Sequence, residues 1–318
     1  MPTIDIAIAT YNGERYISEQ IASILTCSID MPGFSLGSII VSDNKSTDGT
    51  AAIVEALAKH DARIKLVVCD SPGVINNFNF ALQRTSAEYI MLCDQDDFWL
   101  KNKIQLSLEK IIELELEVGK NSPLLVFSDL SVTDSELNVT EPSFFVAQRL
   151  KPNSYLYPKH IFLANVAPGC TMMFNRKLLD MALPIPTTAA MHDWWLLLIA
   201  STFGRVAHLN VPTILYRQHA NNQVGAPSKR YRTVLLSPFR QLQMAGVRLG
   251  KSSQQARVFR EKFPEFPQRY GEAINFMADF GNMSKIKRVT GLLTKKIEHV
   301  TPARKAAMLV LALFMPSR

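Results

Sequence analysis

Short apolar runs alternate with stretches of helical periodicity through the first half of the chain. The runs cover residues 4–10, 38–43, 64–68 and 88–93. The stretches between and after them cover residues 14–25, 50–59, 74–85 and 101–117. Short continuous apolar runs are typical of strands buried on both faces, and an apolar period near 3.6 is typical of amphipathic helices. Strands that alternate with helices predict an α/β fold with a mostly parallel sheet flanked by helices.

The second half of the chain carries weaker signals. Further strands are expected over residues 124–129 and 170–174. We expect a loop over residues 212–228, because the apolar periodicity is lost there. Helices are expected over residues 193–203, 242–262 and 283–314, with breaks at the prolines.

Composition excludes several classes of protein. The chain has 318 residues, of which 47% are hydrophobic and 20% charged, so it is globular rather than fibrous or disordered. The four cysteines are far apart and form no CxxC pair, which argues against a disulfide framework and suits a reducing cytoplasm. The longest apolar run, 306–315, is too short to span a bilayer, and the first residues lack the basic start of a secretory signal. We therefore expect a cytoplasmic protein.

Charge divides the chain into two parts. Residues 228–318 contain 18 Lys or Arg and only 5 Asp or Glu, whereas the net charge of the whole chain is +7. This division predicts a first domain over residues 1–225 and a basic α-helical region over 226–318. Lysines that surround apolar residues from Ser284 onward favour a helix in the membrane interface, on the inner face of the cell membrane. Packing on the first domain and contact between copies of the chain are the alternatives, and nucleic-acid binding lacks any recognition motif.

Three of the predicted strands end in polar clusters. The first ends in TYNG, the second in DNKSTDGT and the fourth in DQDD. Ligands of open α/β sheets bind outside the carboxyl ends of the strands. Turn formation explains any one cluster, but the carboxylates of Asp94, Asp96 and Asp97 repel one another unless a cation intervenes. Oxygen ligands on so short a segment suit Mg²⁺ or Mn²⁺, whereas the motifs GxGxxG and GxxxxGK[ST] are absent.

Three strings of residues resemble one family of enzymes. IAIATYNGERYISEQIASIL, IIVSDNKSTDGT and EYIMLCDQDDFWLKNKI are similar to the family-2 glycosyltransferases, which have a GT-A fold. The resemblance covers residues 3–225. Within the family, the forms DQDDFW, HDWW and RQHxxN are most similar to bacterial rhamnosyltransferases that build surface polysaccharide.

The resemblance implies a site for a nucleotide-diphosphate sugar donor. Thr10, Tyr11 and Asn12 match the segment that holds the nucleobase and ribose, and Asp43 matches the aspartate that hydrogen-bonds the base. Many relatives carry a basic residue and an asparagine near residues 74–80. This chain has only asparagines there, of which Asn77 is the expected donor contact.

The resemblance also implies a divalent metal, Mn²⁺ or Mg²⁺. Asp94 matches the first aspartate of the family's D-x-D pair, at the ribose or sugar, and Asp96 matches the second, which binds the metal. Asp97 is not required by the pattern. His219 is expected as a further metal or phosphate ligand, and Arg217 as a partner of phosphate oxygens.

The acceptor side is implied by a second cluster. Asp193 matches an acidic residue at a helix start that acts as general base toward the acceptor hydroxyl, and the alternative is a helix N-cap. Gly169 would let the backbone approach the sugar closely. His192, Trp194 and Trp195 are expected at the acceptor, although a tryptophan on a helix is more often part of the core.

The reaction implied is an inverting transfer of a sugar to a growing surface polysaccharide or a lipid-linked glycan. The donor is dTDP-rhamnose or a UDP-sugar such as UDP-galactose or UDP-glucose. No glycosyl-enzyme nucleophile is needed, since the acceptor oxygen attacks the anomeric carbon in line. A nucleotidyltransferase is disfavoured because TYNGER is a poor match to a basic phosphate loop. A non-catalytic nucleotide- or nucleic-acid-binding protein and an oligomer stay open.

Overall fold

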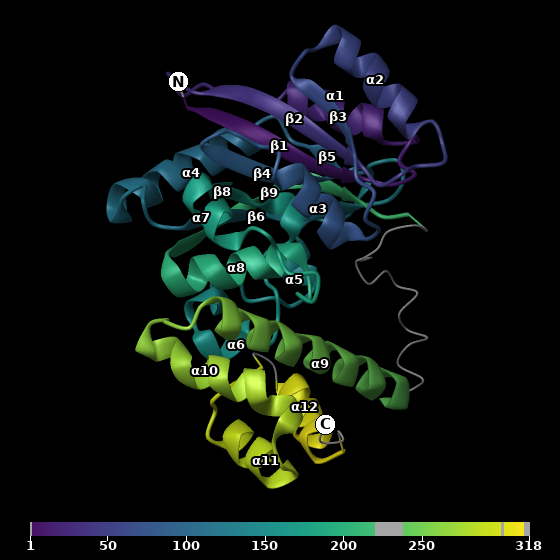
Figure 1. Ribbon diagram of the computed structural model, residues 1–318. Coiled ribbons are helices and arrows are strands. Elements are labelled where there is room, and N and C mark those ends of the chain that lie inside the picture. The colour runs from purple at the N-terminus through teal and green to yellow at the C-terminus, as the bar shows by residue number, and fades with distance from the viewer. Residues whose placement is uncertain (1, 220–237, 300–301, 315–318) are drawn as a thin grey trace.

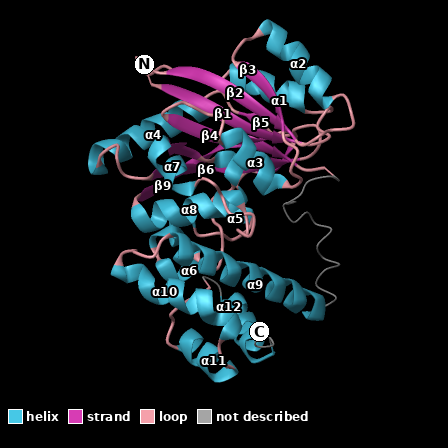
Figure 2. Ribbon diagram, viewed as in Figure 1, coloured by secondary structure: helices cyan, strands magenta, loops and turns pink. Residues whose placement is uncertain are grey.

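The computed structural model describes residues 2–219, 238–299 and 302–314. Within these residues, one sheet lies in the upper part of Figure 1, with helices against both of its faces. The helices that follow residue 238 lie together below it. Figure 2 shows the same view, in which every labelled strand belongs to the upper part of the molecule.

The first half of the chain alternates strand and helix as predicted. Strands β1 to β4 span Thr3–Thr10, Ser35–Asp43, Ile64–Val68 and Tyr89–Asp94. Helices α1 to α4 span Ile17–Leu25, Thr50–His60, Val74–Leu82 and Lys103–Val118. All eight predicted elements are present, and their ends differ from the prediction by a few residues at most.

The first four strands place their carboxyl ends at one edge of the sheet. β1 pairs in parallel with β2 on one side and with β4 on the other, and β2 pairs in parallel with β3. Thr10 aligns with Asp43, and Ala9 aligns with Asp94. The polar clusters that follow β1, β2 and β4 therefore lie side by side.

The second half of the chain completes the sheet with shorter antiparallel pairings. The strand order is β3-β2-β1-β4-β8-β6-β9-β5, with β7 paired to β6. Strands β5 to β9 span Phe98–Trp99, Leu124–Thr133, Val139–Glu141, Met173–Asn175 and Arg205–Arg217. β8 is antiparallel to both β4 and β6, whereas the long β6–β9 pairing is parallel.

Two predictions for this half are wrong in part. The expected loop over 212–228 begins inside β9, whose residues continue to Arg217, and residues 220–228 lie outside the described residues. The strand expected over 170–174 is shorter, because Gly169–Thr171 form a 3-10 turn (η2) before β8 begins at Met173.

Alternation along the strands fills a separate core on each face of the sheet. Ile4, Ile6 and Ile8 of β1 pack in one cluster with buried side chains of α1, α2 and α4. Ala7 points to the other cluster, which contains buried side chains of α3 and of two later helices, α7 and α8. Successive side chains of a strand point to opposite faces, so both faces of β1 are covered and most of its side chains are apolar.

The remaining helices lie on the second face and below it. Short helices α5, η1 and α6 span Phe144–Ala147, Pro152–Leu156 and Pro158–Ile161, followed by α7 over Arg176–Ala182 and α8 over His192–Phe203. The last helices, α9 to α12, span Pro238–Lys262, Gln268–Asp279, Lys285–Leu293 and Pro302–Phe314. α10 was not among the predicted helices. None of the helices in the described ranges is both long and apolar enough to cross a membrane.

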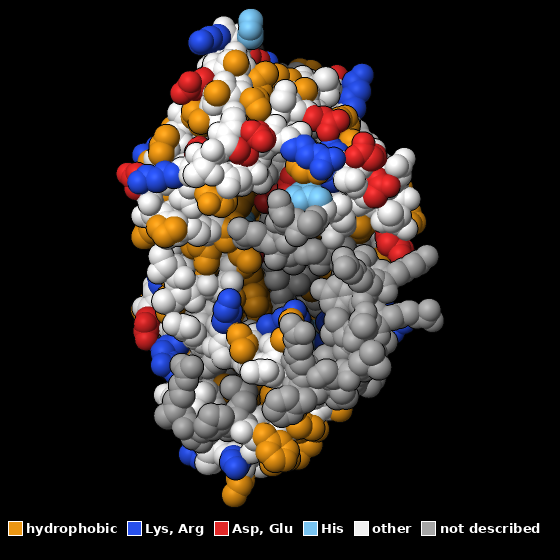
Figure 3. Space-filling model, turned by 90° about the vertical axis from the view of Figure 1, so that its right-hand side faces the viewer, with side chains coloured by type: hydrophobic (Ala, Val, Ile, Leu, Met, Phe, Trp, Pro, Cys, Tyr) orange, Lys and Arg blue, Asp and Glu red, His pale blue; other side chains and the backbone are white. Residues whose placement is uncertain are grey.

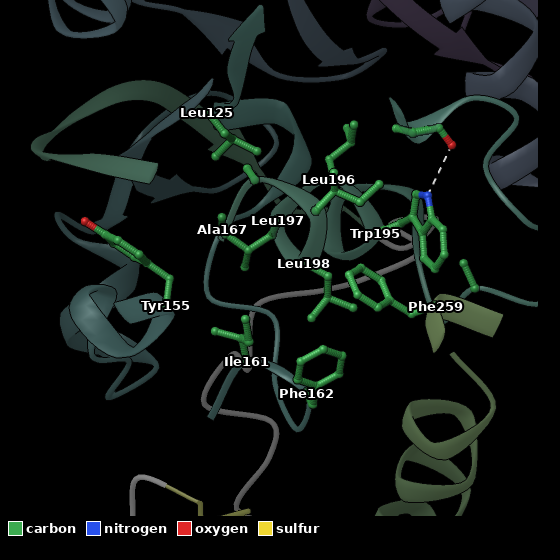
Figure 4. Close-up of a cluster of buried hydrophobic side chains, with 14 of the residues drawn as sticks. Leu125, Tyr155, Ile161, Phe162, Ala167, Trp195, Leu196, Leu197, Leu198 and Phe259 are labelled. Atoms are coloured by element: carbon green, nitrogen blue, oxygen red, sulfur yellow. Dashed lines mark hydrogen bonds between the residues drawn. The ribbon is translucent and has the colours of Figure 1, made fainter. Parts of the chain in front are cut away.

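The C-terminal helices share a core with α8. Trp195 of α8 packs against Phe259 of α9, with ring centres 5.6 Å apart, and Phe162 packs on the same ring from below (Figure 4). The same cluster extends to Met277 of α10 and Leu311 of α12. The predicted domain boundary near residue 225 lies outside the described residues, and the two-domain division stays a prediction.

Candidate active site

Gln95 ties the loop after β1 to the loop after β4. The Thr10 hydroxyl donates to Gln95 Oε1 over 2.6 Å, and the Tyr11 amide donates to the same oxygen over 2.9 Å. A Cβ atom on Gly13 would lie 2.5 Å from that oxygen, so a larger residue there would displace the Gln95 side chain. Gln95 was not among the predicted site residues, because an amide in a polar loop carries no signal of its own.

A second set of hydrogen bonds joins the loops after β1 and β2. Asn12 has a φ of 51°, a left-handed conformation that is uncommon for residues other than glycine. Its Oδ1 accepts from the Thr47 amide and its own amide donates to Ser46 Oγ, both over 2.8 Å. The buried Asp43 carboxylate accepts from the Ser46 amide over 2.8 Å. Asn12 and Asp43, both predicted to bind the sugar-nucleotide donor, thus share Ser46 as a hydrogen-bond partner.

Asn77 lies against the same edge from α3. Its side-chain amide donates to the Thr10 main-chain oxygen over 3.1 Å. Its Oδ1 is buried and has no hydrogen-bond partner among the described residues. Because unpaired buried oxygens are rare, this one is available to a ligand that enters beside Thr10.

The end of β4 and the residues that follow it hold three carboxylates that are largely shielded from solvent. Asp97 is fully buried and Asp96 is 8% exposed. Burial, together with the neighbouring Asp96 and Asp193, raises the pKa of Asp94 to about 7. Burial and the charges of Asp96 and Asp94 also raise the pKa of Asp97, whose Oδ2 has no hydrogen-bond partner among the described residues. A bound cation would relieve this repulsion.

Two groups of side chains in this region bring candidate metal ligands together. Asp94, Asp97 and Cys170 each offer a ligand atom, and the three atoms lie within 4.8 Å of one another. Asp96 Oδ2 lies 2.8 Å from His219 Nε2, so the two predicted metal ligands are brought together from distant parts of the chain. Burial and the nearby carboxylates raise the pKa of the Cys170 thiol well above its ordinary value, which makes it a poor ligand. The oxygen-rich set therefore fits a hard cation such as Mg²⁺ or Mn²⁺.

Arg217, the predicted phosphate contact, lies buried behind the acidic segment. Its guanidinium donates through Nε to the Asp96 main-chain oxygen over 3.0 Å and forms an ion pair with Glu19. Its amide donates to Asp97 Oδ1 over 3.3 Å. These bonds hold the acidic segment in place, and a contact between Arg217 and donor phosphates stays a prediction.

A buried lysine also lies near the acidic segment. Lys103, the first residue of α4, is fully buried, and its Nζ lies 4.7 Å from the centre of the Trp99 ring. Burial lowers the pKa of Lys103 to about 8, although neighbouring groups that include Asp97 oppose this shift. Lys103 was not among the predicted site residues, because a lysine at a helix start is ordinarily solvated. The positive charge of Lys103 offsets part of the negative charge of the acidic segment.

Asp193 lies in the first turn of α8, where Met191 is the N-cap residue. Its Oδ2 accepts from the Gly169 amide over 3.0 Å, and its Oδ1 accepts from the Trp194 amide over 2.6 Å. Burial raises the pKa of Asp193 to about 6, against these two amides and the Asn165 side chain, which lower it. The structure contradicts the alternative of an N-cap role, and the carboxylate has the pKa that suits a general base near neutral pH.

The other residues predicted to bind the acceptor differ in how they lie around Asp193. A Cβ atom on Gly169 would lie 3.1 Å from His192 Nε2 and 3.2 Å from Asp193 Cβ, so the η2 turn packs closely on the start of α8. His192 stacks on Phe78, with ring centres 3.9 Å apart, and burial lowers its pKa to about 3, so the ring is neutral. Neither of its ring nitrogens has a hydrogen-bond partner among the described residues.

The adjacent tryptophans have different surroundings. Trp194 is half-buried and its indole nitrogen donates to the Ile161 main-chain oxygen over 2.6 Å. Trp195 is fully buried in the core of Figure 4, where its indole nitrogen donates to the Ala182 main-chain oxygen over 3.2 Å. The structure therefore contradicts a stacking contact between Trp195 and an acceptor sugar.

The donor and acceptor clusters meet at the edge where the strands end. The Asp193 carboxylate is close enough to Asp94 to raise its pKa, although the two residues are far apart in sequence. Figure 3 shows this face of the molecule, where acidic side chains and a histidine gather above a hollow that runs down its middle. One side of the site thus holds the acidic groups around Asp94, which suit a cation, and the other side holds the Asp193 carboxylate, whose pKa is raised.

Comparison with known proteins identifies the class of this protein. The family model for glycosyl transferase family 2 matches residues 5–180, which is more than half of the chain. The chain therefore belongs to glycosyl transferase family 2, as the resemblance of its motifs indicated.

Two curated relatives are named as sugar transferases. The chain is 31% identical over 234 residues to the dTDP-rhamnosyl transferase RfbG of Shigella flexneri, which covers 69% of this chain and 74% of that protein. It is 27% identical over 179 residues to the UDP-Glc:α-D-GlcNAc-diphosphoundecaprenol β-1,3-glucosyltransferase WfgD of Escherichia coli, which covers 56% of this chain and 62% of that protein.

Solved structures support the fold. Residues 1–349 of TarS from S. aureus match with a TM-score of 0.52 at 16% identity, over 98% of this chain and 90% of that one. The mannosyltransferase PcManGT of Pyrobaculum calidifontis, solved with GDP-Man and Mn²⁺, matches with a TM-score of 0.52 at 16% identity, over 100% of this chain and 82% of that one. The chain is thus a glycosyltransferase of the GT-A fold, followed by a basic helical region.

Proposed function

We propose that this protein is an inverting, metal-dependent glycosyltransferase that moves a sugar from a nucleotide-diphosphate donor to a surface polysaccharide or a lipid-linked glycan. One observation carries the proposal: the carboxylate of Asp193, with a raised pKa, faces the acidic group around Asp94 at the edge where the strands end. A base on one side and a cation site on the other is what in-line displacement of a nucleotide diphosphate requires.

The residues divide the work as follows. Asp193 takes the proton of the acceptor hydroxyl, while its hydrogen bonds to the Gly169 and Trp194 amides hold the carboxylate in one orientation. Thr10, Tyr11, Asn12, Asp43 and Asn77 surround the nucleoside of the donor. Asp94, Asp96 and His219 would hold Mg²⁺ or Mn²⁺, and that cation would supply positive charge for the departing diphosphate. His192 and Trp194 border the acceptor beside the base.

The donor we favour is dTDP-rhamnose. It is supported by the 31% identity to a dTDP-rhamnosyl transferase over most of the chain. A UDP-hexose is the second candidate, because a diphosphoundecaprenol-dependent glucosyltransferase matches over a shorter part of the chain. We further propose that the basic helices rest on the inner face of the cell membrane, where such an acceptor is held.

A thermal-shift experiment tests the donor site. We expect dTDP or UDP with Mn²⁺ to raise the melting temperature of the full chain, because a ligand that binds only the folded state stabilises it by mass action. Asp96→Ala should abolish that rise. Asp180→Ala, at an exposed position on α7, is the matched control and should leave it intact.

The pair of nucleotides also separates the two donor classes, since the one with the larger shift identifies the nucleobase. A melting temperature that no nucleotide changes, with or without Mn²⁺, would contradict the proposed function. Salt-sensitive binding to DNA in such a protein would instead support a nucleic-acid-binding role.

A further inference from the structure

Tyr16, the N-cap residue of α1, is a buried tyrosine to which the proposed reaction assigns no role. The turn before it is closed by hydrogen bonds from the amides of Tyr16 and Ile17 to the Gly13 main-chain oxygen, both over 3.0 Å. This turn follows directly on the loop after β1. Tyr16 is therefore carried by the same loop as the predicted nucleoside contacts.

The ring of Tyr16 stacks on the ring of His219. The two ring centres lie 4.9 Å apart, and the ring planes meet at 29°. The same imidazole has its Nε2 atom 2.8 Å from Asp96 Oδ2. A planar ring that contacts both a stacking partner and a carboxylate has little freedom to turn. The orientation of the His219 ring is thus set from two sides.

His219 lies beyond the end of β9. That strand ends at Arg217, two residues before the histidine. Residues outside helices and strands are held by side-chain contacts more than by a ladder of backbone hydrogen bonds. The position of the His219 ring therefore depends on the groups that contact it, and the Tyr16 ring and the Asp96 carboxylate are two of these.

Tyr16 is itself held in place by the loop that carries it. The Thr10 hydroxyl and the Tyr11 amide both donate to Gln95 Oε1, and Gln95 Nε2 donates to the Tyr11 main-chain oxygen over 3.2 Å. Gln95 belongs to the acidic segment, residues 94–97. The loop after β1 is therefore attached to that segment through Gln95, and Tyr16 is presented to His219 from a fixed support.

Tyr16 also contacts Arg217, which has other anchors. The guanidinium carbon of Arg217 lies 4.6 Å from the centre of the Tyr16 ring. The same guanidinium forms an ion pair with Glu19 and donates to the Asp96 main-chain oxygen over 3.0 Å. These bonds hold Arg217 whether or not the tyrosine ring is present. We therefore expect loss of the ring to disturb His219 more than Arg217.

We propose that Tyr16 is a positioning residue for the cation site: its ring holds the imidazole of His219 against Asp96, so that both side chains are in place before Mg²⁺ or Mn²⁺ binds. The inference rests on the proposed function, in which Asp96 and His219 belong to that site. The contact uses the face of the tyrosine ring and not its hydroxyl, so phenylalanine would serve equally well.

The affinity of the full chain for Mn²⁺ alone tests this role, measured from the electron paramagnetic resonance signal of the free ion. We expect Tyr16→Leu to weaken binding by about tenfold, because partners that orient a metal-bound histidine contribute on that order to metal affinity. Tyr16→Phe should stay within about twofold of the wild type, since it keeps the ring. Tyr155→Leu is the matched control and should change nothing, because this equally buried ring packs against Phe127 and His208 instead.

A double-mutant cycle separates positioning from a general loss of structure. In a His219→Ala background, Tyr16→Leu should change the affinity for Mn²⁺ by less than about twofold, because the ring then has no imidazole to hold. A loss of the same size in both backgrounds would overturn the proposal. A Tyr16→Leu variant that binds Mn²⁺ as tightly as the wild type would overturn it as well.

A measurement on the wild-type chain does not depend on how the leucine variant folds. The nuclear magnetic resonance signals of the His219 ring protons, assigned with His219→Gln, should lie upfield of those of His60, an exposed histidine, because a stacked aromatic ring shields them. Signals at the same position as those of His60 would overturn the stacking and the proposal with it.

Failure of this inference and failure of the proposed function give different results. A wild-type chain that binds no Mn²⁺ by itself would overturn the inference, because the two side chains would then not be in place before the cation. The thermal shift with dTDP or UDP and Mn²⁺ would still decide the proposed function in that case.

Discussion

At Asp193, burial and hydrogen bonding act against each other. The carboxylate is 8% exposed, and burial raises its pKa to about 6 in spite of the amides of Gly169 and Trp194. The folded protein therefore holds a proton there more tightly than the unfolded chain does. Its negative form, which the reaction needs, is the form that destabilises the fold.

The activity of Asp193→Asn tests this residue directly. We expect kcat/KM of the wild type to rise with pH and level off above about 6, because the base must be ionised. The variant should lose about 10²–10⁴-fold in kcat and keep its affinity for the nucleotide. A variant that retains most of its activity would exclude Asp193 as the base.

The pH dependence of the free energy of unfolding gives a second, independent test of the raised pKa of Asp193. Since its folded pKa is raised, its contribution to stability is greatest below about pH 4 and is lost as pH rises through about 6. Relative to Asp193→Asn, the wild type should lose up to about 3 kcal/mol across that window. Urea unfolding at several pH values measures the difference. A constant difference would mean that the pKa is not raised.

Some of the candidate site could be predicted at the residue scale and some could not. Asp94, Asp96 and Asp193 carry chemistry that their residue types reveal. Trp194 and Trp195 could not be separated, because adjacent residues on a helix point about 100° apart and only packing decides which is buried. Gln95 was missed because its role depends on two loops that meet only in the folded chain.

Gly204, between α8 and β9, lies directly against the backbone of another segment. A Cβ atom on Gly204 would lie 1.7 Å from the Pro123 main-chain oxygen, just before β6 begins. No side chain can occupy that space without a shift of the backbone. The close approach allows β9 to enter the sheet beside β6, where the two strands pair in parallel.

Gly204→Ala should therefore destabilise the protein strongly. We expect a loss of about 3 kcal/mol, since the backbone of two paired strands must move. Gly250→Ala is the matched control: this glycine lies within α9, with open space around it, and alanine favours helix by roughly 0.5–1 kcal/mol. Equal effects of the two substitutions in thermal unfolding would contradict the packing described here.

Elements were predictable where one apolar pattern governs them. β1 and β4 are buried on both faces, so their sequences are mostly apolar and rich in β-type residues. β9 was missed in part, because it contains Asn210 and Pro212 and its pairing with β6 shifts register near Asp129. A proline is tolerated at such an irregularity, although in sequence it indicates a loop.

The whole molecule joins its two parts through apolar packing rather than through a free tail. Met308, Leu311 and Ala312 of α12 belong to the same cluster as Trp195 of α8. One alternative for the basic tail, packing on the rest of the protein, therefore holds for this helix. Deletion of residues 284–318 would expose that core, so point substitutions are the better probe of membrane contact.

The outer face of α11 provides such a probe. Ile286 and Leu293 are 76% and 65% exposed, and lysines lie beside them. We expect Ile286→Ser/Leu293→Ser to reduce sedimentation with anionic vesicles several-fold, because both apolar and ionic contacts support interfacial binding. Leu116→Ser, at an 85% exposed position on α4, is the control. Unchanged sedimentation of the double variant would contradict membrane docking by this helix.

The burial of α8 has a consequence for how this enzyme can change its specificity. Ten of its twelve residues are buried, so the helix that carries Asp193 is also a central element of the hydrophobic core. The loops that hold Tyr11 and Lys45 are exposed and bear little of the packing. Libraries that aim to alter donor specificity can vary exposed positions such as Tyr11 and Lys45, whereas variation along α8 will mostly yield chains that fail to fold. We therefore expect the donor specificity of this enzyme to change more readily in evolution than the geometry of its acceptor site.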